Sequence, residues 1–388
     1  GFSADEWVAP KPGTEGLLAL AIAASVVRQG RSRVTGAEAD RLRGFLARFG
    51  ARSAAESTGV AEAVIDRLAR EFTDASPSLA VAGGVAHQHR AATQTAVAVN
   101  LLNYLAGNVG RTVVFAAASA WDRVARYRDL DEVVAAMDAG HIDVAFVNGA
   151  NPAFTVPRSR EFAAAYRKVG LKVAFASHLD ETASLSDLLL PDHTPIERWG
   201  EAEPVAGVRG IVQPAMTPCL DTRQCADVLL QIAQQAGKTV ARVGAASARD
   251  LVQAGRPERD FDVVVQHGGA FGPVAAQPVR LVNDFVRLPY QAPAFDGGAE
   301  GMVLVVYPSA TLFDGRGANK GWLQELPDVA AKITWQTWVE VHPETAARLG
   351  VVSGDVVRVT SPHGTVEVPA YVYPGVRRDV VAMPIGQG

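Results

Sequence analysis

The stretch LKVAFASHLDETASLSDLLLPDHTPIERWGEAEP, residues 171–204, decides our interpretation of the fold. It opens with an apolar run at 173–176 that is typical of a buried strand. A polar turn follows at 177–182, and a second apolar run at 188–190 ends at a proline. Open α/β sheets bind ligands where polar side chains follow the carboxyl end of a strand. The same turn also suits the N-cap of a short helix, so a ligand site and a structural turn both stay open.

Two earlier stretches repeat this pattern of an apolar run followed by small and polar residues. Residues 144–147 precede Asn-Gly-Ala-Asn-Pro at 148–152, and residues 79–82 precede a Gly-Gly pair and two histidines within 83–89. Glycine lets the backbone approach a ligand closely, and proline stiffens the turn. Three such strands in a row predict a parallel, doubly wound sheet. We expect the carboxyl ends of all three strands to line one crevice.

A loop rich in proline and glycine, residues 8–16, precedes an Ala/Leu-rich helix that should end near residue 29. Thr14 is placed to cap this helix, with Glu15 in its first turn. The backbone N–H groups of such a loop and helix N-terminus can also hold a phosphate, so both interpretations stay open. Residues 60–72 predict an amphipathic helix, because their apolar positions recur every four residues.

The pattern changes to short strands after a linker at residues 289–301. A strand is also expected earlier, at 263–265. Short strands with turns between them and one small helix predict a closed β-barrel. We therefore expect two domains, an α/β region over residues 1–295 and a barrel over residues 296–388. The barrel strands are expected at 302–307, 338–341, 355–360, 365–373 and 380–383.

Composition excludes several classes of protein. With 48% hydrophobic and 20% charged residues, the chain of 388 residues is globular rather than disordered. A net charge of −4 argues against nucleic-acid binding, and no apolar run reaches the roughly 18 residues of a transmembrane helix. Two cysteines, Cys219 and Cys225, are too few for a zinc or iron–sulfur site, so we expect structural thiols and leave a disulfide open. Because the chain begins at Gly1 rather than Met, we expect it to be a fragment.

Four segments resemble the molybdopterin oxidoreductases, the dimethyl sulfoxide reductase superfamily. They occur in the order of the family and extend over nearly the whole chain. The resemblance implies doubly wound, mainly parallel α/β layers and then a double-psi β-barrel of the molybdopterin-dinucleotide-binding kind. The segments are PGTEGLLALAIA at 12–23, GANP at 149–152, LDETASLSDLLLPDHTPIERWG at 179–200 and WVEVHPETAARLGVVSGDVVRVTSPHGTVEVPAYVYPGVRRDVVAMP at 338–384.

A fifth segment, VYPSATLFDGRGANKGWLQELPD at 306–328, is similar to the molybdopterin-like large subunit of alternative complex III and to polysulfide-reductase-type subunits. This similarity implies a subunit of a respiratory quinol:electron-acceptor oxidoreductase that supports electron transfer without molybdenum of its own. The implied location is the periplasmic face of a bacterial membrane complex. The implied partners are an iron–sulfur region or subunit, a membrane quinol-binding subunit and cytochrome subunits, with the iron–sulfur clusters outside this chain. The alternative is the catalytic subunit of a polysulfide or thiosulfate reductase, which binds bis-molybdopterin guanine dinucleotide.

If a dinucleotide cofactor binds, the resemblance implies a set of contacts along the crevice. The acidic turn would then lie beside a guanine, whose N1–H and amine favour a carboxylate. Ala176 stands where cofactor-bearing relatives often have an Asp, and a buried donor without its acceptor costs about 1–3 kcal/mol, which counts against the cofactor. The implied contacts are Gly13, Thr14, Glu15, Gly83, Gly84, Gly149, Asn151, Pro152, Asp180, Glu181 and Thr182.

We assign no catalytic residue and no metal ligand within the chain, because in active relatives the protein ligand to the metal lies N-terminal to this region. Asp192 and His193 are expected to be surface residues at a turn that Pro191 stops. A further group is expected in a loop that faces solvent or another subunit. Its members are Asp314, Arg316, Asn319 and Trp322.

Overall fold

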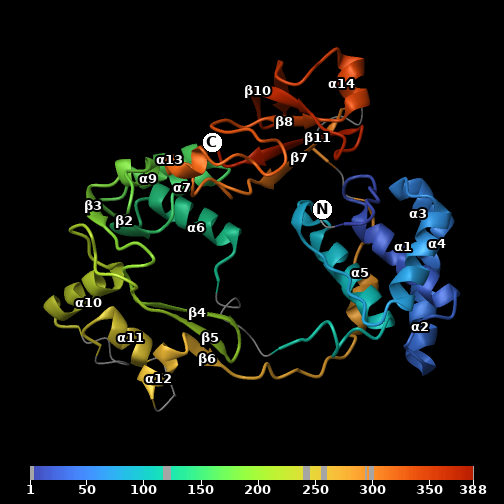
Figure 1. Cartoon of the computed structure of the whole chain (residues 1–388), viewed down its shortest axis with the longest axis horizontal. Helices are drawn as coiled ribbons and strands as arrows, with labels where there is room; N and C mark the ends of the chain where they lie inside the picture. The colour runs from blue at the N-terminus through green and yellow to red at the C-terminus, as the bar shows by residue number, and fades with distance from the viewer. Residues whose placement is uncertain are drawn as a thin grey trace. The chain divides into compact units, whose positions relative to one another are not determined.

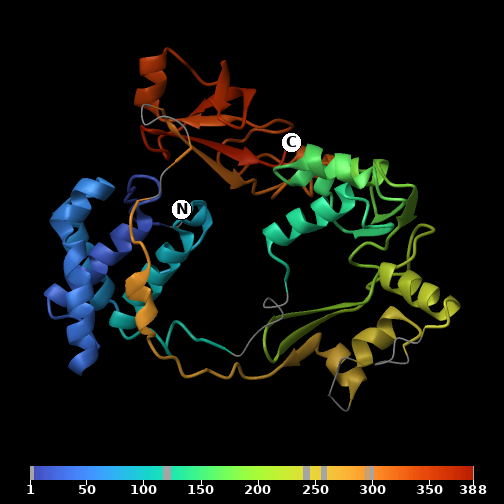
Figure 2. The same ribbon diagram turned by 180° about the vertical axis from the view of Figure 1, so that it is seen from behind.

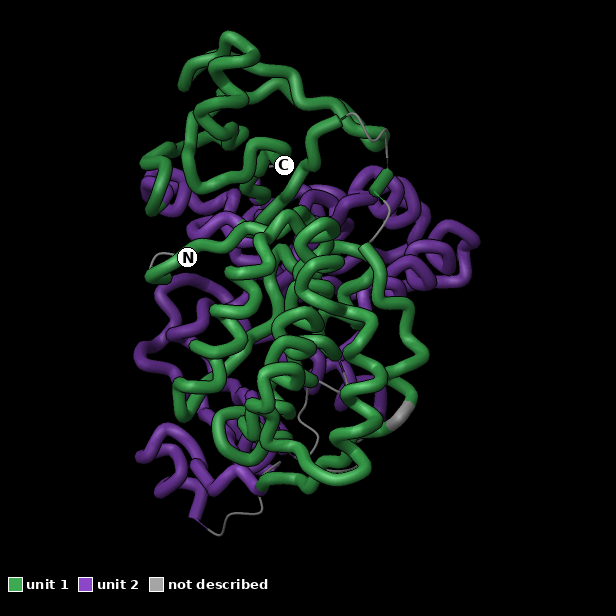
Figure 3. Tube along the Cα trace, turned by 90° about the vertical axis from the view of Figure 1, so that its right-hand side faces the viewer, with its two compact units in different colours: residues 1–115, 276–308, 329–385 green, residues 116–275, 309–328, 386–388 purple. Residues whose placement is uncertain are grey.

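Residues 4–116, 124–238, 245–254, 260–292, 295–296 and 301–387 are described by the computed structural model. The chain divides into two units, each built from separate segments (Figure 3). Unit 1 contains residues 1–115, 276–308 and 329–385, and unit 2 contains residues 116–275, 309–328 and 386–388. The domain boundary that the sequence predicts between residues 295 and 296 stays a prediction.

The first part of unit 1 is a layer of helices (Figure 1). The long helices α1 and α5 lie side by side, and Gly16 permits this approach because a Cβ there would lie 2.8 Å from Thr95 Oγ1. The segment with η4 (Asn283–Arg287) returns to the same core, where the Phe285 and Phe45 ring centroids are 5.0 Å apart. The elements of this layer are α1 (Glu15–Arg28), α2 (Gly36–Leu46), η1 (Ala47–Phe49), α3 (Ala51–Thr58), α4 (Glu62–Asp74), η2 (Gly84–His87) and α5 (Ala92–Leu105).

The strand expected at residues 79–82 is wrong. These residues form no strand, because a side chain on α5 takes the place of a neighbouring strand. The buried Asn103 amide accepts a hydrogen bond from Ala80 N at 2.9 Å and donates one to Ala80 O at 2.8 Å. The backbone polar groups of Ala80 are thereby satisfied without a sheet. Thr14 is the N-cap residue of α1 and Glu15 lies in its first turn, as expected, but the Thr14 hydroxyl donates to Lys11 O at 2.6 Å and makes no capping hydrogen bond to the helix.

The second part of unit 1 is a mixed sheet with strand order β7-β11-β8-β10-β9. Its core contains Val339, Val341, Ala346, Val368 and Ala370. The predicted β domain at the end of the chain is therefore confirmed. Among the described residues, however, β7 and β9 are the two ends of the sheet, so its strands do not close into the barrel that we expected. The elements are β7 (Val303–Pro308), β8 (Val339–Val341), α14 (Pro343–Leu349), β9 (Val356–Ser361), β10 (Gly364–Val372) and β11 (Val380–Ile385).

Unit 2 contains the parallel sheet that the sequence predicts, in the order β1-β2-β3. The helices α6 and α8 pack on one face of it, against Ala145 and Val147. The α/β class is confirmed, although residues 79–82 are not part of this sheet and β3 was not expected. The elements are α6 (Tyr127–Asp138), β1 (Val144–Asn148), α7 (Pro152–Thr155), α8 (Ser159–Tyr166), β2 (Leu171–Ala176), α9 (Glu181–Ser184) and β3 (Leu188–Pro191).

The rest of unit 2 holds an antiparallel sheet, with a long hairpin of β4 and β5 that is visible in Figure 2. The strand expected at residues 263–265 is wrong, because this run lies in α12 and Asp260 caps that helix by accepting from Val263 N at 3.2 Å. In the described ranges, no helix has the length and apolar character to cross a bilayer. The elements are β4 (Gly200–Val205), β5 (Val208–Val212), α10 (Cys225–Gln235), α11 (Ala248–Ala254), α12 (Phe261–Gln266), β6 (Gly269–Phe271) and α13 (Gly321–Gln324).

Candidate functional site

The two units divide the predicted cofactor contacts between them. The crevice that we expected from all three turns therefore stays a prediction, and each group is considered by itself. Those in unit 1 are Gly13, Thr14, Glu15, Gly83 and Gly84. Those in unit 2 are Gly149, Asn151, Pro152, Asp180, Glu181 and Thr182.

In unit 2, the turns after β1 and β2 meet because these strands are parallel neighbours. Asn151 Oδ1 accepts from Thr182 N at 3.1 Å and from Thr182 Oγ1 at 2.8 Å. The other end of the Asn151 amide donates to Glu181 Oε2 at 2.6 Å, and Thr182 Oγ1 accepts from Ala153 N at 3.0 Å. Asn151 and Thr182 are buried. These two side chains therefore bind one turn to the other, and this use competes with a ligand for them.

Two carboxylates remain at this edge of the sheet. Asp180 caps α9 by accepting from Ala183 N at 2.8 Å, so the structural interpretation of this turn is confirmed. Burial raises the pKa of Asp180 above its usual range, although that hydrogen bond opposes the shift. Glu181 is exposed, and it also accepts from Asn319 Nδ2 at 3.3 Å. The edge is acidic and suits a ligand that offers N–H donors.

The segment at 309–328 contributes to the same unit. Asn319, which we expected in a loop facing solvent or another subunit, contacts Glu181. The ring of the exposed Trp322 lies 6.1 Å from that of His178. Arg316 forms an ion pair of 2.7 Å with Asp314 and lies over the ring of Phe313. Its charge is thus already balanced by a neighbouring carboxylate.

In unit 1, a cavity of about 320 Å³ lies against the N-terminal loop and strands β7, β8 and β11. Two of the five predicted contacts in this unit, Gly13 and Glu15, line it. Thr14 is buried and its hydroxyl is bonded within the loop. Gly83 and Gly84 follow no strand and are not among the lining residues. Gln88 and His89, which follow the Gly-Gly pair in the sequence, also line the cavity. Sequence reasoning missed three further polar lining residues, Tyr307, Glu340 and Arg377.

The polar atoms at this cavity include an unpaired donor and an unpaired acceptor. His89 Nδ1 accepts from Ala91 N at 3.0 Å, so in the neutral ring the proton is on Nε2. Nε2 is buried without a hydrogen-bond partner, 3.9 Å from Glu15 Oε2, which also has none. Glu340 accepts from Tyr307 at 2.6 Å, and Arg377 is paired with Asp379 at 2.8 Å. This lining suits a neutral group that both donates and accepts hydrogen bonds.

Replacement of Glu15 by glutamine should raise the melting temperature of the full-length protein at pH 8. Burial raises the pKa of Glu15, so the folded state favours the protonated carboxyl. The contribution of this group to stability is complete below its unfolded pKa near 4.5 and is lost as pH rises through its folded pKa. Glutamine keeps the shape and carries no charge to desolvate. The gain should therefore disappear near pH 4.5, in thermal melts recorded at a series of pH values.

The matched control is Glu62→Gln, since Glu62 is an exposed residue in the first turn of α4 and Glu15 lies in the first turn of α1. Both substitutions remove the same favourable interaction with a helix dipole. If Glu15→Gln lowers the melting temperature at pH 8 more than the control does, the Glu15 carboxylate has a charged partner in the full-length protein.

The expectation that Asp192 lies at the surface is wrong, because the residue is buried, with 6% of its surface exposed. Asp192 Oδ1 accepts from His193 N and Cys225 N, both at 3.0 Å. Its Oδ2 accepts from Asn148 Nδ2 at 3.2 Å and lies 3.5 Å from the Arg198 guanidinium. This residue therefore joins the end of β1 to the turn after β3 and the start of α10. The sequence carries no signal of this role beyond the position of an acid after a strand.

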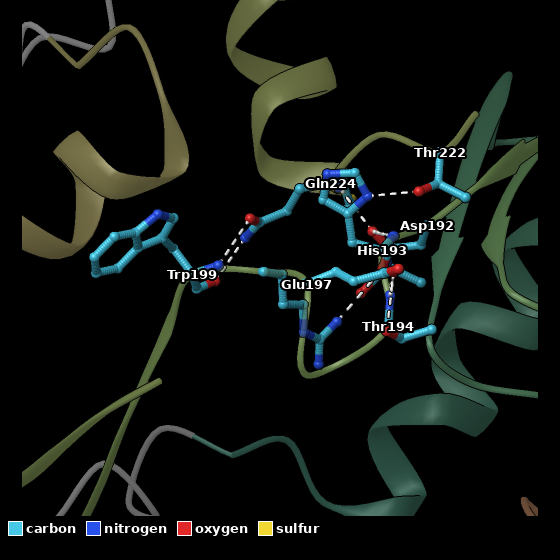
Figure 4. A network of polar contacts seen from close by, with 10 residues as sticks. Asp192, His193, Thr194, Glu197, Trp199, Thr222 and Gln224 are labelled. Carbon is cyan, nitrogen blue, oxygen red and sulfur yellow. Dashed lines mark hydrogen bonds and ion pairs between the residues drawn. The ribbon is translucent and has the colours of Figure 1, made fainter. Parts of the chain in front are cut away.

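The loop beside Asp192 is held by further polar contacts (Figure 4). Glu197 accepts from Cys219 N at 2.9 Å and from Thr194, and these hydrogen bonds hold its pKa below its usual range. His193 Nδ1 lies 2.7 Å from Thr222 Oγ1. Both cysteines are free thiols, as expected. Within the described part of the chain, no group of three or more His, Cys, Asp or Glu side chains could hold a metal ion.

Two family models match the chain. The model described as "Molybdopterin oxidoreductase" matches residues 2–235, and the model described as "Molydopterin dinucleotide binding domain" matches residues 317–388. The first match extends over more than half of the chain. The second falls on the β domain, as the resemblance predicts.

The chain is also similar to named proteins. It is 29% identical to the "Menaquinone reductase, molybdopterin-binding-like subunit" of Nitratidesulfovibrio vulgaris, over 99% of this chain and 57% of that protein. It is 22% identical to the "NADPH-Fe(3+) oxidoreductase subunit alpha" of Geobacter sulfurreducens, over 66% of this chain and 29% of that protein. The structure of acetylene hydratase from Pelobacter acetylenicus has the same fold, with a TM-score of 0.73 and 13% identity over 99% of this chain and 64% of that one. The chain thus spans little more than half the length of the first relative.

Proposed function

The chain belongs to the molybdopterin oxidoreductase family, and we propose that it is part of a subunit in a respiratory quinol:electron-acceptor oxidoreductase of the alternative complex III type. In this proposal it supports electron transfer and holds no molybdenum of its own. Its partners are an iron–sulfur region or subunit, a membrane quinol-binding subunit and cytochrome subunits. The complex lies on a bacterial membrane, with this part at the periplasmic face.

The charge of the predicted contacts is the observation that supports a subunit without the cofactor. A molybdopterin dinucleotide brings phosphates, which bind cations and N–H donors. The contacts that we predicted include three carboxylates, on Glu15, Asp180 and Glu181, and no cation. Arg377, which lines the cavity of unit 1, is already paired with Asp379. Arg316, in the 309–328 segment, is already paired with Asp314. No side chain among the predicted contacts therefore offers a positive charge to the phosphates, which supports a subunit that holds no molybdopterin.

The similarity to the menaquinone reductase subunit supports the same proposal. That relative is named "molybdopterin-binding-like", and the match extends over 99% of this chain. Its name also refers to menaquinone, which is consistent with an electron carrier of the quinone class. Because the chain spans 57% of that relative, the activity of the whole protein belongs to the proposal.

The alternative function is a catalytic subunit of the polysulfide or thiosulfate reductase type, which would bind bis-molybdopterin guanine dinucleotide. The observation that favours it is the acidic edge formed by Asp180 and Glu181 at the carboxyl end of β2. The N1–H and exocyclic amine of a guanine would find acceptors there.

Metal analysis of the purified full-length protein tests the two functions directly. We expect molybdenum far below one atom per chain, no pterin fluorescence after oxidation of an acid extract, and iron present in the same sample. Iron serves as the control, because it shows that the preparation has retained its cofactors. Molybdenum near one atom per chain, together with a pterin signal, would establish the alternative function.

A further inference from the structure

The cavity of unit 1 has two buried polar atoms in its lining residues that lack hydrogen-bond partners. All of the lining residues belong to unit 1, and the volume of about 320 Å³ lies within the range of small-molecule sites. The His89 side chain is only 5% exposed, and its Nε2 has no partner among the described residues. Glu15 Oε2 has none there either. Native proteins rarely leave such groups unpaired, so this pair requires an explanation.

A single hydroxyl group can satisfy both atoms. His89 Nδ1 accepts from Ala91 N, so the neutral ring offers an N–H at Nε2, while the Glu15 carboxylate offers an acceptor. The 3.9 Å between Nε2 and Oε2 is too long for a direct hydrogen bond. It is also shorter than two normal hydrogen bonds placed end to end, at about 2.7 and 2.9 Å, so one oxygen atom can reach both. An ammonium group lacks the acceptor and an ether lacks the donor, and each would leave one atom unpaired.

The other charged side chains of the lining already have partners. Arg377 forms an ion pair of 2.8 Å with Asp379. Glu340 is buried and accepts from the Tyr307 hydroxyl at 2.6 Å. An anionic ligand would therefore meet the Glu15 carboxylate, and no unpaired cation among the described lining residues would offset that repulsion. The lining favours an uncharged ligand.

The rest of the lining is mostly apolar and contains aromatic rings. Trp7 is 59% exposed and Phe295 is 49% exposed, so both retain surface that a ligand can cover. Aromatic pairs in offset-stacked or edge-to-face arrangements are favourable beyond the area that they bury, which favours a ring as the body of the ligand. The other apolar lining residues include Pro10, Pro12, Val85, Val305 and Val376.

We propose that this cavity binds an uncharged aromatic compound of the phenol class, whose hydroxyl donates to Glu15 Oε2 and accepts from His89 Nε2. The observation that carries the proposal is the unpaired donor and the unpaired acceptor, 3.9 Å apart, in the lining of one cavity. Such a ligand differs from a molybdopterin dinucleotide, whose phosphates would be repelled by Glu15. The inference does not depend on the proposed function, and the molybdenum content of the protein does not test it.

The test compares phenol with anisole, its methyl ether, on the full-length protein. Anisole keeps the ring and the oxygen acceptor but has no hydrogen to donate to Glu15. We expect saturable binding of phenol at one site per chain in titration calorimetry, and roughly tenfold weaker binding of anisole because a buried acceptor stays unpaired. In protein with isotope-labelled histidine, phenol should also shift an imidazole nitrogen signal that is missing from His89→Gln.

A substitution at Glu15 adds a readout that a purely structural role would not change. In Glu15→Ala, phenol should bind about tenfold more weakly than in wild type and no better than anisole. The matched control is Glu62→Ala, since Glu62 is exposed in the first turn of α4, and it should keep the preference for phenol. If Glu15→Ala does not fold, the comparison of the two probes on wild type and the His89 signal decide the outcome.

Three results would overturn the proposal. Equal binding of phenol and anisole to wild type, or no saturable binding of phenol, would show that the two atoms hold a water molecule alone. Binding of phenol without a shift of the His89 signal would place phenol at another site.

Discussion

Replacement of Asp192 by alanine should lower the melting temperature of the full-length protein by about 6–12 °C. The buried carboxylate accepts from two backbone N–H groups, on His193 and Cys225, and from the side-chain amide of Asn148. Alanine leaves these donors without an acceptor, at about 1–3 kcal/mol for each one that stays buried, or on the order of 3 kcal/mol in total. A loss of that size shifts the melting temperature by roughly 2–4 °C per kcal/mol in a unit of this length.

The control for this substitution is Asp221→Ala. Asp221 is exposed on the nearby loop, so its removal should change stability by less than about 0.5 kcal/mol. Hydrogen exchange adds a local measurement, because the amides of His193 and Cys225 should exchange faster in Asp192→Ala alone. Equal melting temperatures for the two variants would show that the Asp192 carboxylate does not hold this loop.

The sequence predicted the strands that adjoin strong turn residues. Residues 144–147 and 173–176 form strands as expected, since Gly149 and Pro152 end the first and a polar turn ends the second. The β character after residue 302 was equally clear, because turns with glycine separate its short strands. Periodicity and turn chemistry are local properties, so they can be read without knowledge of the partners of a strand.

Two short apolar runs were assigned wrongly for lack of that knowledge. Residues 79–82 and 263–265 look alike in the sequence, and a run of this length does not distinguish a strand from another buried segment. In the structure Asn103, more than twenty positions away, supplies the hydrogen bonds of the first run. The second run becomes helical because Asp260 caps it. The first partner is a tertiary contact, which no local pattern contains.

The candidate site was predicted in part for the same reason. That the turns at 149–152 and 180–182 meet follows from parallel neighbouring strands, and the structure has this arrangement. The internal pairing of Asn151 with Thr182 could not be predicted, because the sequence does not give the distance between two polar side chains. The buried position of Asp192 depends likewise on a contact with α10, thirty-three residues away.

Substitution of Asn151 by aspartate should make the stability of the full-length protein depend on pH. Aspartate keeps the acceptor for Thr182, but it replaces the amide donor with a carboxylate 2.6 Å from Glu181 Oε2. Two carboxylates this close cannot both ionise, so they share a proton and the pKa of the pair rises above its unfolded values near 4. Stability is then complete below pH 4 and is lost as pH rises through the raised value. Melting temperatures of Asn151→Asp and wild type should be similar near pH 4.5 and diverge toward pH 8.

Asn151→Ala separates this structural role from a role in ligand binding. Alanine removes the acceptor that the buried Thr182 uses twice, so about 2–3 kcal/mol should be lost, at every pH between 4.5 and 8. A residue that points at a cofactor would behave differently, since its replacement would change the cofactor content and leave the melting temperature of cofactor-free protein unchanged. We expect the aspartate variant to lose stability in a pH-dependent way and the alanine variant to lose the same amount at every pH. The two results together are expected only if Asn151 bonds both Thr182 and Glu181. An aspartate variant whose melting temperature follows wild type at all pH values would contradict the contact with Glu181.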